Sequence, residues 1–272
     1  MLIFACCKSD KDGPCQGKSM ERISRREFLK LSALFTIGIS TPEIKVPCQY
    51  FNSGDPKSEK VAITVDDGWF PDIVGKMVEK SIELNLPIST FPVGSVILQS
   101  PDLWRDIKKR GFEIYNHTQN HEDLGTLDSK KIEEQLTKWE ETYQKTFGEE
   151  YAVKIIRPPF GDGIDKSLFT IADRLNYQGI AGWKVGSQGY SSSYSPEKIW
   201  EMMKDKIVSG SIILLHFVQN DLEILPRIAD LLEEKKLKAV PLSQLPGTPI
   251  YNPIQPRNIP RYPDVRSKLH QV

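Results

Sequence analysis

The chain has 272 residues, enough for one sizeable hydrophobic core without a second domain. Lys plus Arg and Asp plus Glu both number 36, so the chain has no basic field that would bind nucleic acid or anionic lipid. The four cysteines (Cys6, Cys7, Cys15 and Cys48) precede the segment that is expected to fold, and no histidine lies near them, which argues against a zinc finger.

Residues 1–45 have the composition of an export signal and linker. Arg25 and Arg26 are followed by Phe, Leu and Lys and then by a weakly apolar stretch at 31–40, a pattern similar to a twin-arginine signal. The stretch is too short for an ordinary transmembrane helix, so no stable membrane span is expected in the mature form. An Arg-Arg pair can also begin a basic amphipathic helix, and the sequence does not show whether the signal is cleaved. We expect export to the periplasm, cell envelope or exterior.

Beyond this segment, short apolar runs alternate with helical patterns. Strands are expected at 60–65, 86–93, 111–115, 154–156, 179–183, 211–215 and 237–240, and helices at 71–85, 102–110, 128–147, 165–175, 196–208 and 222–236. This alternation predicts an α/β fold with a parallel sheet, either a barrel or an open doubly wound sheet. A single domain is expected over 46–245, followed by an irregular Pro-rich tail at 246–272.

Polar side chains follow the carboxyl ends of several of these strands. They are Asp66 and Asp67, His117, Arg157, Trp183 and His216. In β/α barrels, the loops at this edge build the active site. We therefore expect these side chains to lie close together.

Asp66 and Asp67 are adjacent carboxylates, which repel each other unless a cation lies nearby. A metal ion bound to Asp67 would relieve this repulsion and leave Asp66 as a base. Gly68 permits a sharp turn after the pair. A solvated Asp-Asp-Gly turn is the alternative interpretation.

His117 and His121 are separated by the spacing of one helical turn, so both imidazoles can face one point. Together with Asp67 they make three ligands for a divalent metal that keeps an open position. Zinc is expected, and cobalt and nickel suit the same ligands. A lone histidine is more often an ordinary core residue, but the chain has only 4.

Three further residues are candidates on weaker evidence. Arg157 can pair with a carboxylate, and the prolines after it stiffen a loop whose backbone N–H could stabilise an oxyanion. His216, at the end of an apolar run, is either core or a general acid. Trp183 could wall a carbohydrate pocket or fill the core.

In this order, these pieces resemble the motifs of the polysaccharide deacetylases, the NodB-homology family (carbohydrate esterase family four). Val-Asp-Asp-Gly at 65–68 is similar to the family's Thr-Phe-Asp-Asp-Gly, and 111–121 is similar to Gly-x-Glu-Ile-x-Asn-His-Thr-x-x-His. Arg-Pro-Pro-Phe-Gly at 157–161 resembles Arg-x-Pro-Tyr-Gly, and Leu-Leu-His at 214–216 resembles Leu-x-His. The resemblance implies a distorted (β/α)7-type barrel.

The resemblance also implies a role for each matching residue. Asp66 would be the general base, oriented by Arg157, and His216 the general acid. One divalent metal would be held by Asp67, His117 and His121, and the substrate would meet Phe160, whose N–H joins an oxyanion hole, as well as Trp183 and Leu214. The implied activity is metal-dependent removal of N-acetyl groups from an acetylated aminosugar polysaccharide, peptidoglycan- or chitin-like.

One motif of the family is missing. Gly186 and Gly189 stand where the family has Asp-x-x-Asp, one of whose carboxylates tunes the acid histidine. This absence favours one alternative, a catalytically impaired member that binds glycan. An O-acetyl esterase and a hydrolase of a non-sugar amide also remain open. The sequence does not identify the polymer, the metal or the oligomeric state.

Overall fold

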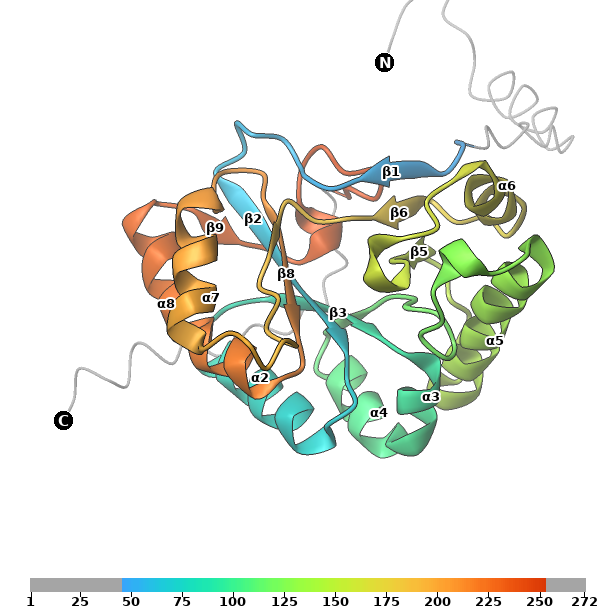
Figure 1. The fold of residues 1–272 in the computed structure, drawn as a ribbon, viewed down its shortest axis with the longest axis horizontal. Helices are drawn as coiled ribbons and strands as arrows, with labels where there is room; N and C mark the ends of the chain where they lie inside the picture. The colour runs from blue at the N-terminus through green and yellow to red at the C-terminus, as the bar shows by residue number, and fades with distance from the viewer. Residues whose placement is uncertain (1–45, 253–272) are drawn as a thin grey trace, which may run out of the picture. The chain divides into compact units, whose positions relative to one another are not determined.

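The computed structural model describes residues 46–252 and shows an α/β domain with helices around the outside of its strands (Figure 1). The strands are β1 (Gln49–Phe51), β2 (Lys60–Asp67), β3 (Ile88–Pro92), β4 (Glu113–Ile114), β5 (Ile155–Ile156), β6 (Gly179–Ala181), β7 (Val185–Gly186), β8 (Ile212–His216) and β9 (Lys238–Ala239). The helices are α2 (Pro71–Glu83), α3 (Gly94–Gln99), α4 (Pro101–Lys109), α5 (Ser129–Phe147), α6 (Lys166–Arg174), α7 (Pro196–Met203) and α8 (Gln219–Glu234). Short 3₁₀ turns are η2 (Leu124–Thr126), η3 (Pro159–Gly161), η4 (Lys204–Lys206) and η5 (Leu242–Gln244).

The named strands pair in parallel and form two sheets. One sheet has the order β1-β6-β5, and the other has the order β4-β3-β2-β8-β7, with β9 pairing the start of β2. Isolated bridges between Asn116 and Ile156 and between Ser53 and Ser211 link the two sheets. Within residues 46–252 the strands do not close into a regular barrel. The expected α/β fold with parallel strands is thus confirmed, as a distorted form of a barrel.

β2 is the central strand because it is apolar on both faces. It pairs with β3 on one side and β8 on the other, and its residues 61–66 are all buried. A parallel strand covered on both faces needs a continuous apolar run, which Val-Ala-Ile-Thr-Val supplies. Its polar end, Asp66 and Asp67, is therefore held at the edge of a rigid scaffold.

Helix α5 matches the sequence prediction closely. The side chain of Asp128 accepts a hydrogen bond from the Lys131 N–H at its start, and Gly148 ends it in a left-handed conformation with φ 72°. Its buried face includes Leu136 and Trp139, which pack in the core. The buried residues recur every three or four positions, as is typical of an amphipathic helix with one face in the core.

Three short elements were not predicted. β1, β7 and α3 have at most six residues each, too few to show a periodic pattern. The prediction that every cysteine precedes the folded part was wrong, because Cys48 is buried beside β1, and burial raises the pKa of its thiol to about 12.

Two helix boundaries also differ from the predictions. α7 ends at Met203 and passes into η4 instead of continuing to residue 208, and α8 begins at Gln219 instead of 222. The earlier start places Asp221 in the first turn of α8, where it is fully buried. Residues 246–252 come after the last element, η5. The Asp55 N–H donates a hydrogen bond to the Pro246 carbonyl at the start of this segment.

Two predictions concern residues that lie wholly or partly outside the described part of the chain: the export segment at 1–45 and the irregular tail at 246–272. Across 46–252, no helix combines the length and apolarity needed to cross a lipid bilayer.

Replacing Ile63 with alanine is expected to lower the free energy of unfolding by about 2–5 kcal/mol, because the side chain is fully buried in the central strand. Urea unfolding followed by circular dichroism measures the change. The control is Val208→Ala, at a side chain that is 42% exposed, where the change should stay within about 0.5 kcal/mol. Equal losses in the two variants would contradict the placement of β2 at the centre of the core.

Candidate active site

The candidate site lies at the carboxyl ends of neighbouring parallel strands. β2 ends with Asp66 and Asp67, and β8 ends with His216, the register partner of Asp66. His117 follows β4, and Arg157 follows β5. The shared edge that the sequence predicted is therefore where the structure brings these five side chains.

Three possible ligand atoms converge at Asp67. Nε2 of His117 lies 3.4 Å and Nε2 of His121 lies 3.2 Å from Oδ1 of Asp67, and one ligand atom from each of the three residues lies within 4.8 Å of the others. Oδ1 of Asp67 is buried and has no hydrogen-bond partner. Two imidazole nitrogens and a carboxylate oxygen that face one point are a common donor set for a divalent metal with an open position. The residues present fit such an ion.

The ring of His117 is held in the orientation that a ligand needs. Its Nδ1 lies 2.7 Å from the Arg157 carbonyl oxygen. Because a carbonyl can only accept, Nδ1 carries the proton and Nε2 keeps its lone pair toward Asp67. Backbone carbonyls commonly orient metal-binding histidines in this way.

The two histidines meet through a loop and not through a helix. The backbone of Thr118 has φ 65° and that of His121 has φ 61°, and the His121 N–H donates to Oγ1 of Thr118. The four-residue spacing therefore brought both rings to one point, but by a tight turn after β4.

Several residues of the site have a left-handed backbone. Of the nine non-glycine residues with positive φ in the described part of the chain, four belong to the site: Asp67 (76°), Thr118 (65°), His121 (61°) and Phe160 (61°). Such conformations cost about 1–3 kcal/mol each and persist only where the surroundings impose them. At Gly68, with φ 104°, a Cβ atom would lie 2.8 Å from the ring of Trp104, so glycine is required there.

Asp67 remains ionised in these surroundings. Burial alone would raise the pKa of its carboxyl group, but the contacts with His117 and His121 outweigh burial and hold that pKa well below its usual value. A carboxylate must be ionised to bind a metal, so the electrostatics of the site suit this role.

Arg157 anchors the second carboxylate from behind. Its guanidinium is fully buried, and its Nη1 donates to Oδ1 of Asp66 at 2.7 Å and to Oγ1 of Thr64 at 2.8 Å. Its Nε and Nη2 donate to the carbonyl oxygens of Ala181 and Gly182. The pairing of Arg157 with a carboxylate, expected from sequence, is thus present, and it fixes the orientation of Asp66.

A cavity of about 560 Å³ opens over these residues. Its walls include Asp66, Asp67, His117, His121, His216 and the three predicted substrate contacts, Phe160, Trp183 and Leu214. Arg157 does not line it and lies below Asp66. Exposed aromatic rings stand at its rim: Trp69 is 41%, Phe160 68% and Tyr190 65% exposed.

Sequence reasoning missed Asp221, which lies against His216. Its carboxylate is fully buried, and its Oδ2 accepts the His216 backbone N–H at 2.7 Å and lies 3.7 Å from Nδ1 of His216. The Ser187 hydroxyl donates to the same oxygen at 2.8 Å. The only sequence signal was an acidic residue five positions after His216, and an acidic residue there more often caps a helix on the surface.

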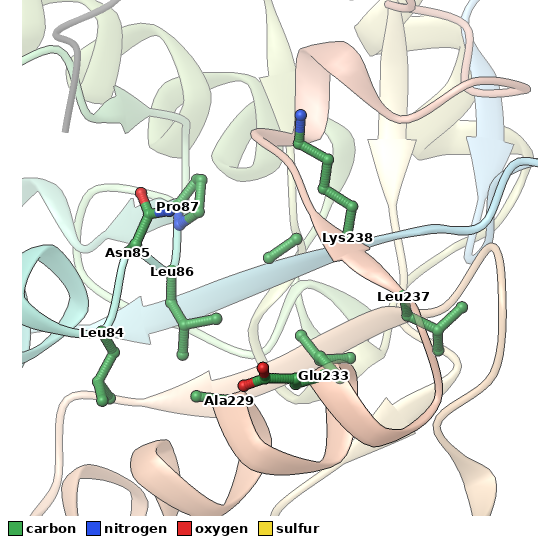
Figure 2. A pocket seen from close by; sticks show the side chains of 10 residues that line it. Leu84, Asn85, Leu86, Pro87, Ala229, Glu233, Leu237 and Lys238 are labelled. Atoms are coloured by element: carbon green, nitrogen blue, oxygen red, sulfur yellow. The ribbon is translucent and has the colours of Figure 1, made fainter. Parts of the chain in front are cut away.

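A second cavity, of about 290 Å³, lies at the opposite ends of the strands (Figure 2). The figure shows its lining from the segment 84–87 before β3, from α8, and from 237–239 around β9. It contains none of the residues predicted for the site, and the only charged side chains among its lining residues are Glu233 and Lys238. Of these two cavities, the one at the carboxyl edge contains the residues described above.

Comparison with known proteins shows which proteins this chain is similar to. The family model described as polysaccharide deacetylase matches residues 53–180. A peptidoglycan-N-acetylglucosamine deacetylase of Bacillus cereus is 28% identical over 72% of this chain and 71% of its own length. Alignments with the first three relatives span 64%, 71% and 94% of those proteins.

Solved structures agree on the fold. The crystal structure of a peptidoglycan N-acetylglucosamine deacetylase superposes with a TM-score of 0.67 at 27% identity, over 74% of this chain and 93% of that one. A family pseudoenzyme from Bacillus anthracis superposes with the same TM-score at 22% identity, over 74% of this chain and 69% of that one. The fold alone therefore does not separate active from inactive members.

The matched residues include both aspartates, both histidines and the arginine of the site, and the resemblance read from the sequence is confirmed. Through residues 53–180, the chain is therefore similar to the polysaccharide deacetylases.

Proposed function

We propose that this protein is a metal-dependent hydrolase that removes N-acetyl groups from an aminosugar polysaccharide of the peptidoglycan or chitin type. One observation carries the proposal: the unpartnered Oδ1 of Asp67 faces Nε2 of His117 and His121, next to an aspartate that a buried arginine holds in place. The match to the polysaccharide deacetylase model and the deacetylase names of relatives support the same reaction class.

Asp67, His117 and His121 would hold the metal, with zinc as the first expectation. When bound, a divalent ion supplies Lewis-acid polarisation of the acetamide carbonyl and lowers the pKa of water from 15.7 toward roughly 7. The adjacent Asp66 takes a proton from the attacking water, and Arg157 keeps the accepting carboxylate turned toward the cavity.

Two groups on the other walls of the cavity act on the departing amine and on the oxyanion: one donates a proton and the other a hydrogen bond. His216 donates a proton to the nitrogen that leaves as the C–N bond breaks. The Phe160 N–H, on the stiff turn after Pro158 and Pro159, donates to the oxygen on which negative charge develops. The tetrahedral centre thus has a base on one side and an acid on the other.

The aromatic residues at the rim of the cavity favour the proposal that the substrate is a sugar polymer. Trp69, Phe160 and Tyr190 present exposed aromatic surface to an open cleft, and flat aromatic faces suit the apolar faces of pyranose rings. We therefore propose an acetylated glycan of the cell wall or a chitin-like chain, encountered outside the cytoplasm after export through the segment at 1–45.

The reaction and its nearest alternatives are separated by one experiment. Acetate release is measured from chitin oligomers, peptidoglycan and acetylated xylan with protein of known metal content. Release from the aminosugar polymers supports the proposal, whereas release from xylan alone would favour the O-acetyl esterase. A protein that takes up no metal and releases no acetate from any of the three would overturn it in favour of a glycan-binding role.

Replacing His121 with alanine is expected to weaken metal binding by more than about 100-fold, since loss of an outer-shell partner alone typically costs 10–100-fold. Zinc content after equilibrium dialysis, measured by mass spectrometry, checks this prediction. Asn120→Ala is the matched control, because the neighbouring side chain is exposed and lies outside the ligand set. Unchanged zinc content in the His121 variant would remove His121 from the site.

A further inference from the structure

Asp221 is a buried acid whose surroundings do not explain it as an ordinary helix residue. Its side chain is fully buried in the first turn of α8, and its Oδ1 has no hydrogen-bond partner. A carboxylate near a helix N-terminus gains a little from the helix dipole. That gain is small compared with the cost of burying a charge and leaving one of its oxygens unpaired.

Within the described residues, the cationic partner found for this carboxylate is the ring of His216. Nδ1 of His216 is itself buried without a hydrogen-bond partner, 3.7 Å from Oδ2 of Asp221. Hydrogen bonds between such atoms are 2.7–3.2 Å long, so a shift of less than about 1 Å closes the gap. This movement gives the buried Nδ1 a hydrogen-bond partner in Oδ2 of Asp221, which places a proton on Nδ1 and turns Nε2 away from the carboxylate.

The carboxylate also fills a space that a neighbouring glycine leaves empty. A Cβ atom at Gly189 would lie 2.1 Å from Oδ1 and 2.4 Å from Cγ of Asp221. Gly189 is one of the two glycines that replace the acidic residues of the family motif. The carboxylate of Asp221 therefore lies where the side chain of residue 189 would begin, but it comes from a different element of the fold.

The loop and the helix are tied together around this arrangement. The Ser187 hydroxyl donates to Oδ2 of Asp221, and the Gly189 N–H donates to Oγ of Ser187. The side-chain amide of Asn220 donates to the Gly189 carbonyl at 3.3 Å. Three contacts thus fix the acid against the loop that lacks its own carboxylate.

We propose that Asp221 is the positioning residue of His216, supplying from α8 the carboxylate that the loop at 186–189 lacks. This inference rests on the proposed deacetylase function, in which His216 donates the proton to the leaving amine. Asp221 holds the imidazole by its Nδ1–H, so that Nε2 faces the cavity with a proton to give. The chain is then complete as an enzyme despite its two glycines.

The electrostatics around His216 agree with this placement. Burial alone would lower the pKa of the imidazole, but Asp221, together with Asp66 and Asp67 on β2, raises it above its ordinary value. The ring of Tyr190 packs edge-on against the imidazole at 5.0 Å between centroids. Loss of the Asp221 charge should therefore lower the pKa of His216, and the protonated acid should be lost at a lower pH.

The first test compares Asp221→Asn with the wild-type protein, both loaded with zinc. Asparagine keeps the shape and one acceptor oxygen but removes the charge. We expect kcat to fall by tenfold or more, and the alkaline limb of the pH profile to move down by about one unit. Histidine-resolved NMR titration should show the same downward movement for His216 without any turnover. Asp230→Asn, at an exposed acid on the same helix, is the control and should change neither.

The second test moves the carboxylate back to the loop. Asp221→Ala should be impaired like Asp221→Asn, and Gly189→Asp in the Asp221→Ala background should recover part of kcat and of the His216 titration, because the removed side chain frees the space. Gly189→Asp alone should disrupt the site, since both side chains cannot fit. If Asp221 only capped helix α8, its replacement would lower the stability in urea without changing the pKa of His216. In that case, Gly189→Asp would not restore the stability.

The outcomes separate this inference from the proposed function. If the zinc-loaded wild type releases no acetate from any acetylated glycan, the proposed function fails, and the NMR titration still judges the Asp221–His216 coupling. If the wild type is active but Asp221→Asn keeps its kcat, pH profile and His216 titration, the positioning role is overturned and the deacetylase assignment stands.

Discussion

Asp66→Asn is expected to lower the rate of acetate release by about 10²–10⁴-fold while the protein keeps its metal. The amide cannot take the proton from the attacking water, yet it has nearly the same size and still offers an oxygen to Arg157. Since Asp67, His117 and His121 are the proposed ligands, zinc content should be unchanged. Steady-state kinetics on chitin oligomers or peptidoglycan, with zinc measured in the same preparation, tests both halves of the prediction.

The control for this variant is Asp72→Asn, in the first turn of α2, where the side chain is exposed to solvent. It should leave both the rate and the zinc content unaltered. If Asp66→Asn retained most of the wild-type rate, another group would have to be the base. If it instead lost zinc, the division of labour between the two aspartates would be wrong.

Arg157→Met is expected to lower the free energy of unfolding by about 3–5 kcal/mol, because it leaves the buried Asp66 carboxylate without its cation. Urea unfolding should be measured on metal-free protein, since a bound ion would itself stabilise the native state. Activity should fall as well, because Asp66 would no longer be held toward the cavity.

A double variant separates the buried charge from general loss of packing. Asp66→Asn/Arg157→Met removes both charges, so it should be more stable than Arg157→Met alone. Arg174→Met is the matched surface control, since that side chain is 57% exposed in its ion pair with Glu133 and should change stability by about 1 kcal/mol or less. Equal destabilisation of the single and double variants would mean that Arg157 supports the fold by its bulk and not by its charge.

Much of the fold could be predicted from local patterns. The apolar run before Asp66, the cap at Asp128 and the terminating Gly148 are decided by residues close in sequence, and each long helix was found within a few residues of its true limits. Short elements such as β1 and β7 escaped prediction because their pairing partners, β6 and β8, supply the hydrogen bonds that define them.

The candidate site also has features that the sequence predicted and features that only the structure shows. Sequence order and strand ends alone nominated Asp66, Asp67, His117 and Arg157, because parallel strands bring their carboxyl ends to one edge. The loop that joins His117 to His121 has a left-handed backbone that side-chain spacing cannot reveal. The two glycines at 186 and 189 suggested that His216 lacks the carboxylate that tunes it in the family. Nothing in the sequence indicated that a carboxylate from the next helix lies against His216.

The sequence by itself therefore determined the α/β class, the family motifs and the residues that can bind a metal, since these depend on residue type and on local order. Only the tertiary structure decided which residue lies against His216, the proposed proton donor. Asp221 reaches His216 because α8 begins three residues earlier than its apolar pattern predicts and turns the acid inward, into space that Gly189 leaves open. A contact of this kind depends on the volume between two elements, which no single stretch of sequence encodes.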